Sequence, residues 1–211
     1  MIKDKITPEL RSRFLEDIKL SKESGKERGF FLCENQERKL IPSKSCEGTE
    51  CEIHLGDPRT GCPPETKTYG EFHTHPYIYS AKRELIKAGK ISPHEELKIG
   101  EELRITMGKN IREAHEKITK VKGITINTPS YTDVLRALLA KSINITNGTV
   151  CTSTDVETDK IECWTIKDIP KEQLKKSAIM AMIELDKVKP VGSQLMKKWI
   201  DDISDREIIH L

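Results

Sequence analysis

The sequence predicts an α+β domain built around a mixed or antiparallel central sheet that is flanked by helices. Two observations lead to this prediction. Apolar residues recur at near-helical spacing near the start of the chain, in a long charged stretch in its middle and in its C-terminal tail. Short apolar runs bounded by turn-forming residues lie between these regions and are typical of buried strands. The length of 211 residues fits a single domain with additions to it.

The first part of the chain predicts one helix followed by three strands. Apolar residues follow helical spacing at Leu10, Phe14 and Ile18, and Gly25 is a suitable residue to end the helix. A long loop rich in Gly, Pro, Asp and Thr precedes the third strand and is expected to be irregular. In chain order the expected segments are a helix from Pro8 to Glu23, strands at Gly29–Cys33 and Lys39–Pro42, the loop from Ser43 to Thr66, and a strand at Thr68–His75.

The rest of the chain predicts further helices around two more strands. A charged stretch from about residue 80 to 122 indicates two or three amphipathic helices, which form an insertion over residues 77–127 of the single domain 1–211. Another helix begins close to Thr128 and continues through Leu138. After it we expect strands at Gly148–Ser153 and Lys160–Ile166, and then two helices, at Lys171–Lys187 and Gly192–Ile209, which form a C-terminal helical extension over residues 170–211.

The composition argues against several classes of protein. Charged residues make up 33% of the chain, but apolar segments recur along it, so a folded domain is expected rather than a disordered one. A formal net charge of +2 gives no reason to expect binding to nucleic acid or to a membrane. No stretch approaches the roughly 18–20 apolar residues that span a bilayer. The N-terminus lacks the apolar core of a signal peptide, so a cytoplasmic location is expected.

The six cysteines fall into two groups, and in a cytoplasmic chain a conventional disulfide framework is not expected. The first group lies in strand-like segments and is interpreted as buried small apolar residues: Cys33, Cys151 and Cys163. The second group clusters in the irregular loop, near His54: Cys46, Cys51 and Cys62. For the second group three interpretations stay open, namely a structural zinc site, a disulfide, or free thiols.

A His-Thr-His-Pro sequence ends the third predicted strand. Alternate side chains of a strand share one face, so His73 and His75 point the same way and can bind one metal ion together. Pro76 ends the strand and leaves the pair at the end of the sheet. By itself such a pair is more often an ordinary pair of polar strand residues than a metal site.

A Ser-x-x-Asp sequence at a predicted helix start supplies a third ligand. Ser130 and Asp133 lie three residues apart and therefore share a face of the helix. An aspartate in the first turn is favoured by the helix dipole and would complete a set of two histidines and one carboxylate. Catalytic zinc typically has three protein ligands and an open fourth position for water, and these residues provide that number.

Together, the His-x-His-Pro and Ser-x-x-Asp sequences resemble the signature of the JAB/JAMM (MPN-domain) zinc metalloproteases. The resemblance covers roughly residues 8–166 and implies a cytidine-deaminase-like α+β fold. It implies that His73, His75 and Asp133 bind Zn²⁺. The family's glutamate precedes a short apolar strand after the first helix, and Glu27 occupies that position here. The resemblance implies that Glu27 accepts a proton from the attacking water and passes it to the leaving amine. It also implies that Ser130 donates a hydrogen bond to the oxyanion.

The resemblance leaves three points open. Glu23 lies one helical turn before Glu27, and Glu71 has the same strand parity as the histidines, so either could take part in the site. The insertion at 77–127 separates the two motifs by far more than the family's usual spacing, and it could be a lid, a substrate-recognition arm or a solvated hairpin.

The implied activity is cleavage of an isopeptide or peptide bond, in a protein substrate that carries a ubiquitin-like modifier. The alternatives are a JAB-type peptidase acting on a sulfur-carrier protein or a cell-wall peptide, and a non-catalytic MPN-type scaffold. Such scaffolds typically lack the metal ligands, which this chain keeps.

Overall fold

The computed structural model describes residues 1–49, 53–76, 129, 131–154, 159–170, 172–173, 176 and 200–211. The predicted insertion at 77–127 and the predicted helix at Lys171–Lys187 therefore lie outside the described residues, apart from three positions of the latter. Ser130 and Cys51 also lie outside them. Among the described residues, no helix is both long enough and apolar enough to cross a lipid bilayer.

The first helix, α1, spans Pro8–Ser24 and confirms the prediction. The Thr7 side chain caps its N-terminus by accepting a hydrogen bond from the Leu10 N–H at 3.2 Å. Gly25 ends it in the left-handed conformation, with φ of 69°, where a residue without a Cβ carries no steric penalty. The helix follows a short 3-10 turn at Lys3–Lys5.

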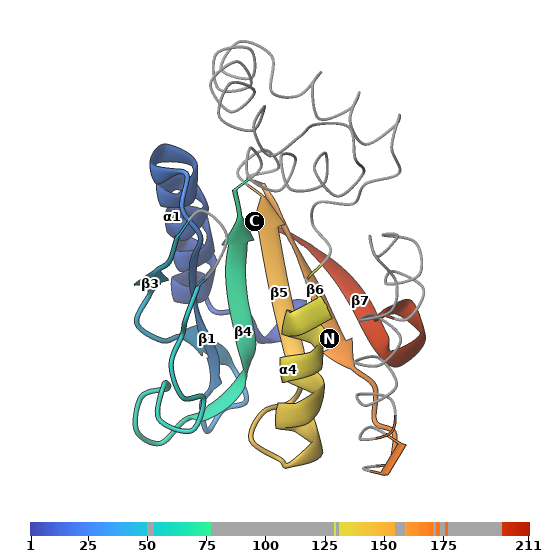
Figure 1. The fold of residues 1–211 in the computed structure, drawn as a ribbon. Coiled ribbons are helices and arrows are strands. Elements are labelled where there is room, and N and C mark those ends of the chain that lie inside the picture. The colour runs from blue at the N-terminus through green and yellow to red at the C-terminus, as the bar shows by residue number, and fades with distance from the viewer. Residues whose placement is uncertain are drawn as a thin grey trace, which may run out of the picture.

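The sheet has seven strands in the order β2-β1-β4-β5-β6-β7, with β3 paired to β1 (Figure 1). β4 and β5 are parallel and the other pairs are antiparallel, so the sheet is mixed. The predicted strands are confirmed, and β3 is a short addition within the loop that was expected to be irregular. The bounds are β1 Arg28–Glu34, β2 Leu40–Pro42, β3 Cys46–Glu47, β4 Lys67–His75, β5 Thr149–Thr154, β6 Lys160–Ile166 and β7 Ser204–His210.

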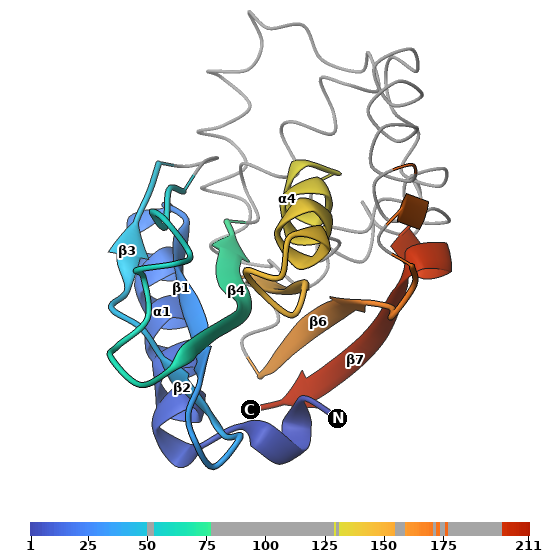
Figure 2. The same cartoon turned by 90° about the horizontal axis from the view of Figure 1, so that it is seen from below.

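The sheet lies between α1 and a second helix, α4, at Tyr131–Ser142 (Figures 1 and 2). Each helix covers its own core. Under α1, Phe14 packs against Phe30 and Phe72, with ring centroids 4.8–5.5 Å apart. Under α4, a second buried cluster joins the helix to β5, β6 and the segment before β7: Val134, Leu135, Ala137, Leu138, Val150, Trp164, Ile166, Ile200 and Ile203. Because side chains alternate along β4, one set of them faces α1 and the other set faces α4.

The end of the chain is a strand, so the prediction of a helix through Ile209 is wrong over its last residues. Residues 200–203 are helical, but Ser204–His210 form β7 and pair with β6 along its whole length, from Lys160↔His210 to Ile166↔Ser204. The apolar residues of this tail fit a helical spacing as well as a strand. Pairing with the open edge of β6, together with an ion pair from Arg206 to Glu162 at 3.0 Å between Nε and Oε2, decides in favour of the strand.

Two disulfides also correct the sequence analysis. Cys151 and Cys163 lie directly opposite each other in the β5–β6 pair and are bonded, and Cys33 of β1 is bonded to Cys62. The cysteines of the strands are buried, as expected, but they are not free thiols. Because Cys62 is bonded to Cys33, it is not available as a zinc ligand beside Cys46, which is a free thiol. These pairings depend on strand register, which the cysteine spacing does not reveal.

Candidate metal centre

Two histidines at the end of β4 face the same side of the sheet. His73 is buried and His75 is partly exposed. Their Nε2 atoms lie 3.0 Å apart, and the rings meet edge to face. The side chains between and before them, Thr74 and Phe72, point to the opposite face and pack under α1. The strand therefore presents exactly two imidazoles to the face covered by α4, as its alternation predicts.

Asp133 approaches this pair from the first turn of α4. Its Oδ2 atom lies 3.4 Å from Nε2 of His73. The helix is held in this position by Val134 and Leu138, which are almost completely buried against the second core. One ligand atom from each of the three residues lies within 4.8 Å of the others. Residues that are far apart in the sequence thus meet at one point.

The two separations measured from His73 are close to those around a tetrahedral zinc ion. Zn–N and Zn–O bonds of about 2.0–2.1 Å place two ligand atoms about 3.3 Å apart on a tetrahedron. The 3.0 Å and 3.4 Å separations at His73 are close to that value. The other ring nitrogen of His73, Nδ1, is buried and has no hydrogen-bond partner among the described residues. Metal-binding histidines usually donate from that nitrogen, so the described part of the chain provides the ligand but not the group that would orient its ring.

The electrostatics of the site favour a cation. Burial alone would lower the pKa of His73, but the carboxylates of Asp133, Glu71 and Glu27 raise that pKa to about 9. Without a metal, the imidazole therefore holds a proton at neutral pH as the positive charge that these acids require. A divalent ion would satisfy the same requirement and would compete with this proton for the ring.

Glu27 lies just before β1 and is buried, with 9% of its surface exposed. Its negative charge raises the pKa of both His73 and Arg136, so the carboxylate acts on the candidate metal centre. Glu23 is placed differently. Its side chain is 58% exposed on α1 and pairs with Lys19 at 4.0 Å. Of the two glutamates considered, Glu27 is the one whose charge acts on the histidine.

Glu71 shares the face of the histidines but is engaged elsewhere. Its Oε1 atom lies 3.2 Å from Nη2 of Arg136, one turn after Asp133 on α4. The same Nη2 atom is 3.9 Å from Oδ1 of Asp133. Arg136 was not predicted from the sequence, because its partner Glu71 belongs to another element and only its spacing of three residues from Asp133 pointed to the site. The pair connects β4 to α4 beside the ligands.

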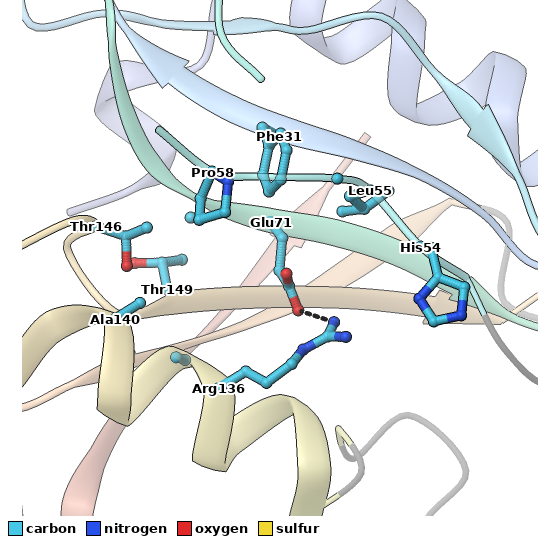
Figure 3. A pocket seen from close by; sticks show the side chains of 12 residues that line it. Phe31, His54, Leu55, Pro58, Glu71, Arg136, Ala140, Thr146 and Thr149 are labelled. Carbon is cyan, nitrogen blue, oxygen red and sulfur yellow. Dashed lines mark hydrogen bonds and ion pairs between the residues drawn. The ribbon is translucent and has the colours of Figure 1, made fainter. Parts of the chain in front are cut away.

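A hollow of about 240 Å³ adjoins this pair. Its floor is formed by β1, β4 and β5, and one wall is α4. The other wall is the loop from His54 to Pro58, which the disulfide at Cys62 ties to β1. Figure 3 shows the side chains of Glu71, from β4, and Arg136, from α4, pointing toward each other. The apolar lining residues are Phe31, Leu55, Pro58, Ala137 and Ala140.

The chain matches no family model, and the search of curated proteins finds no match either. The function is therefore inferred from the residues and the geometry of the site.

Proposed function

We propose that the protein is a zinc-dependent hydrolase of the JAB/JAMM type that cleaves an isopeptide or peptide bond. The observation that carries this proposal is the meeting of His73, His75 and Asp133 at one point, with the charge of Glu27 acting on the same site. The three ligand types fit a catalytic zinc site, which keeps one position open. A structural zinc site would instead use four protein ligands.

The order of the elements supports a JAB/MPN-like fold. One helix precedes the strand that follows Glu27, the histidines end a central strand, and the aspartate begins a helix on the same face of a mixed sheet. The strand at the C-terminus extends this sheet beyond β6. The parallel pairing of β4 and β5 places the ends of both strands at the same edge of the sheet, and Asp133 connects the first turn of α4 to His73 there.

The chain's own residues then have distinct tasks. Bound zinc would supply a water of lowered pKa and a Lewis acid for the scissile carbonyl. Glu27 would accept a proton from the attacking water and deliver it to the nitrogen of the departing amine. Its burial near Arg136 keeps it in a partly dry environment where such transfers are effective. Ser130 would donate a hydrogen bond to the oxygen that gains negative charge.

The hollow beside Glu71 and Arg136 supports a protein substrate. Its walls offer apolar contacts from Leu55 and Pro58 of the loop and from Ala137 and Ala140 of α4. We propose that these apolar contacts hold part of a peptide substrate beside the metal centre. A substrate bearing a ubiquitin-like modifier is proposed from the resemblance of the motifs. A sulfur-carrier protein or a cell-wall peptide are the alternative substrates.

A non-catalytic scaffold is the second candidate function, and metal content separates it from an enzyme. We expect the purified protein to hold one zinc ion at this site and to cleave a fusion of a ubiquitin-like modifier to a reporter protein. Chelator should stop cleavage and zinc should restore it. His73→Ala should lose both zinc and cleavage, whereas His210→Ala, which changes an exposed histidine on β7, should keep both. A protein that binds no zinc would contradict the proposal.

A further inference from the structure

We infer that Thr74 and Ser21 are positioning residues that hold the backbone of Glu27 in place relative to the two histidines. This inference rests on the function proposed above. Thr74 stands between His73 and His75 in sequence, but its side chain points to the opposite face of the sheet, under α1. It is therefore connected to both ligands through the strand without being a ligand itself.

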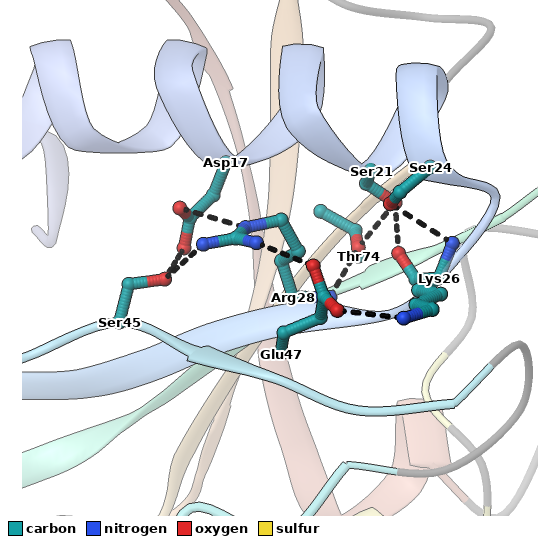
Figure 4. Close-up of polar contacts among 8 residues, drawn as sticks. All are labelled: Asp17, Ser21, Ser24, Lys26, Arg28, Ser45, Glu47 and Thr74. Atoms are coloured by element: carbon teal, nitrogen blue, oxygen red, sulfur yellow. Dashed lines mark hydrogen bonds and ion pairs between the residues drawn. The ribbon is translucent and has the colours of Figure 1, made fainter.

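The two hydroxyls form a directed chain of hydrogen bonds (Figure 4). The Arg28 N–H donates to Oγ1 of Thr74 at 2.9 Å. Thr74 in turn donates its proton to Oγ of Ser21 at 2.8 Å, and Ser21 donates to the carbonyl oxygen of Lys26 at 2.8 Å. Both hydroxyl side chains are completely buried, at 0% exposure, so no water competes for these bonds.

This chain of bonds closes on the two residues that flank Glu27. It holds the carbonyl of Lys26 on one side and the N–H of Arg28 on the other. The remaining groups of the same two peptides are bonded to the loop near β3: Glu27 N–H donates to the Thr49 carbonyl at 2.7 Å, and the Glu27 carbonyl accepts from Gly48 at 2.8 Å. Both peptide groups of Glu27 are thus fixed, and the hydroxyl pair is the part that ties them to the ligand strand.

The hydroxyls act where regular pairing between the strands stops. The β1–β4 register ends at Gly29↔His73, one residue short of Arg28. The Thr74 side chain extends the connection by that one residue, from the strand that carries the ligands to the segment that carries Glu27. Catalysis by a base depends on its distance from the reacting water, and a displacement of about 1 Å can reduce turnover about a hundredfold.

The test compares Thr74→Val, which removes the hydroxyl at nearly constant shape, with Thr74→Ser, which keeps it. In the zinc-loaded protein, we expect Thr74→Val to lower kcat about tenfold to hundredfold with unchanged KM and one bound zinc. Thr74→Ser should restore kcat. In the zinc-free protein, amide hydrogen exchange at Arg28 should become faster in Thr74→Val and stay at the wild-type rate in Thr74→Ser.

Thr68→Val is the matched control, because Thr68 is a buried threonine of the same strand whose hydroxyl is bonded to the Pro58 carbonyl instead. It should leave the exchange at Arg28 unchanged. If Thr74→Val does not fold, Ser21→Ala replaces it and should have the same effects.

Three results would overturn the inference: wild-type kcat in Thr74→Val, an equal loss in Thr74→Val and Thr74→Ser, or unchanged exchange at Arg28. The exchange measurement needs neither zinc nor substrate. A wild-type protein that cleaves nothing would contradict the proposed function, and the exchange rates would still decide whether these hydroxyls fix the backbone at Glu27.

Discussion

His73 Nε2 lies 3.4 Å from Asp133 Oδ2, and the charges of Glu71 and Glu27 act on the same ring. This contact keeps a proton on a buried ring that would otherwise lose it. In the zinc-free protein the pKa of His73 is raised from 6.5 to about 9. The pair is therefore a candidate cation site, at which a bound metal ion would replace the proton.

The first prediction concerns the pH dependence of the zinc-free protein. Because the pKa of His73 is higher in the folded protein, its ion pair contributes stability that is fully present below the ordinary pKa of about 6.5. That contribution is lost as the pH rises through about 9. The His73 ring signals in NMR should titrate with a midpoint near 9, and Asp133→Asn should move the midpoint down. A midpoint near 6.5 in the wild-type protein would contradict the expected electrostatics.

Zinc binding should depend on pH in the opposite direction, becoming stronger as the pH rises, because the His73 ring must lose its proton before it binds the metal. Between pH 7 and 9, calorimetry in buffers of different ionisation enthalpy should detect release of a proton on zinc binding. The apparent affinity for zinc should increase over the same range. An affinity independent of pH there would show that His73 does not exchange a proton for the metal.

The second prediction separates the role of Glu27 from that of Glu71. Glu27→Gln should lower kcat by about 10²–10⁴-fold with zinc retained, because an amide cannot accept the proton. Glu71→Gln should have a much smaller effect, since the Glu71 carboxylate is engaged with Arg136 at 3.2 Å. Zinc content and kcat are measured for both variants. If Glu71→Gln removes turnover and Glu27→Gln does not, the assigned roles are reversed.

Local patterns in the sequence predicted that the two histidines lie together on one face, and the reason is physical. A strand alternates its faces, so His73 and His75 had to point the same way. Asp133 was found from the signature of a helix start. What these patterns could not supply was the approach of α4 to β4, which depends on packing of Val134 and Leu138 over β5 and β6. Arg136 was missed for the same reason, since its partner belongs to another element.

The strand at the C-terminus and the disulfides were not predicted because both depend on pairing across the sheet. β7 becomes a strand only because β6 offers an open edge, and local spacing at Ile208 and Ile209 does not distinguish it from a helix. Cys151 meets Cys163 through the register of β5 and β6. A prediction from local sequence alone does not contain this register.

The third prediction concerns the Cys33–Cys62 disulfide, which ties the wall of the hollow to β1. The double variant Cys33→Ser, Cys62→Ser should have a free energy of unfolding about 2–4 kcal/mol lower than the wild type, because the bridge restricts the unfolded chain. Denaturant unfolding with and without reductant measures this. Cys46→Ser, which changes a free thiol, is the control and should have little effect. Equal stability of oxidised and reduced wild-type protein would contradict the prediction.

The fourth prediction tests whether the close approach of β1 and β4 sets the geometry of the ligands. A Cβ at Gly29 would lie 2.4 Å from the Phe72 carbonyl oxygen and 3.1 Å from Cβ of His73. An added Cβ at this position could fit only if β1 moved away from β4, the strand that carries the two histidines. Gly29→Ala should therefore lower the free energy of unfolding by about 1–3 kcal/mol and also weaken zinc binding.

Gly56→Ala is the comparison, because a Cβ at Gly56 meets no atom within 4 Å although φ is +90°. It should cost stability through backbone strain, of about 1–3 kcal/mol, but leave zinc affinity unchanged. Both variants are compared by denaturant unfolding and by competition with a chromophoric chelator. If Gly29→Ala loses stability to the same extent and keeps full zinc affinity, the strands relax away from His73. The ligand geometry would then depend on the helices rather than on the spacing between β1 and β4.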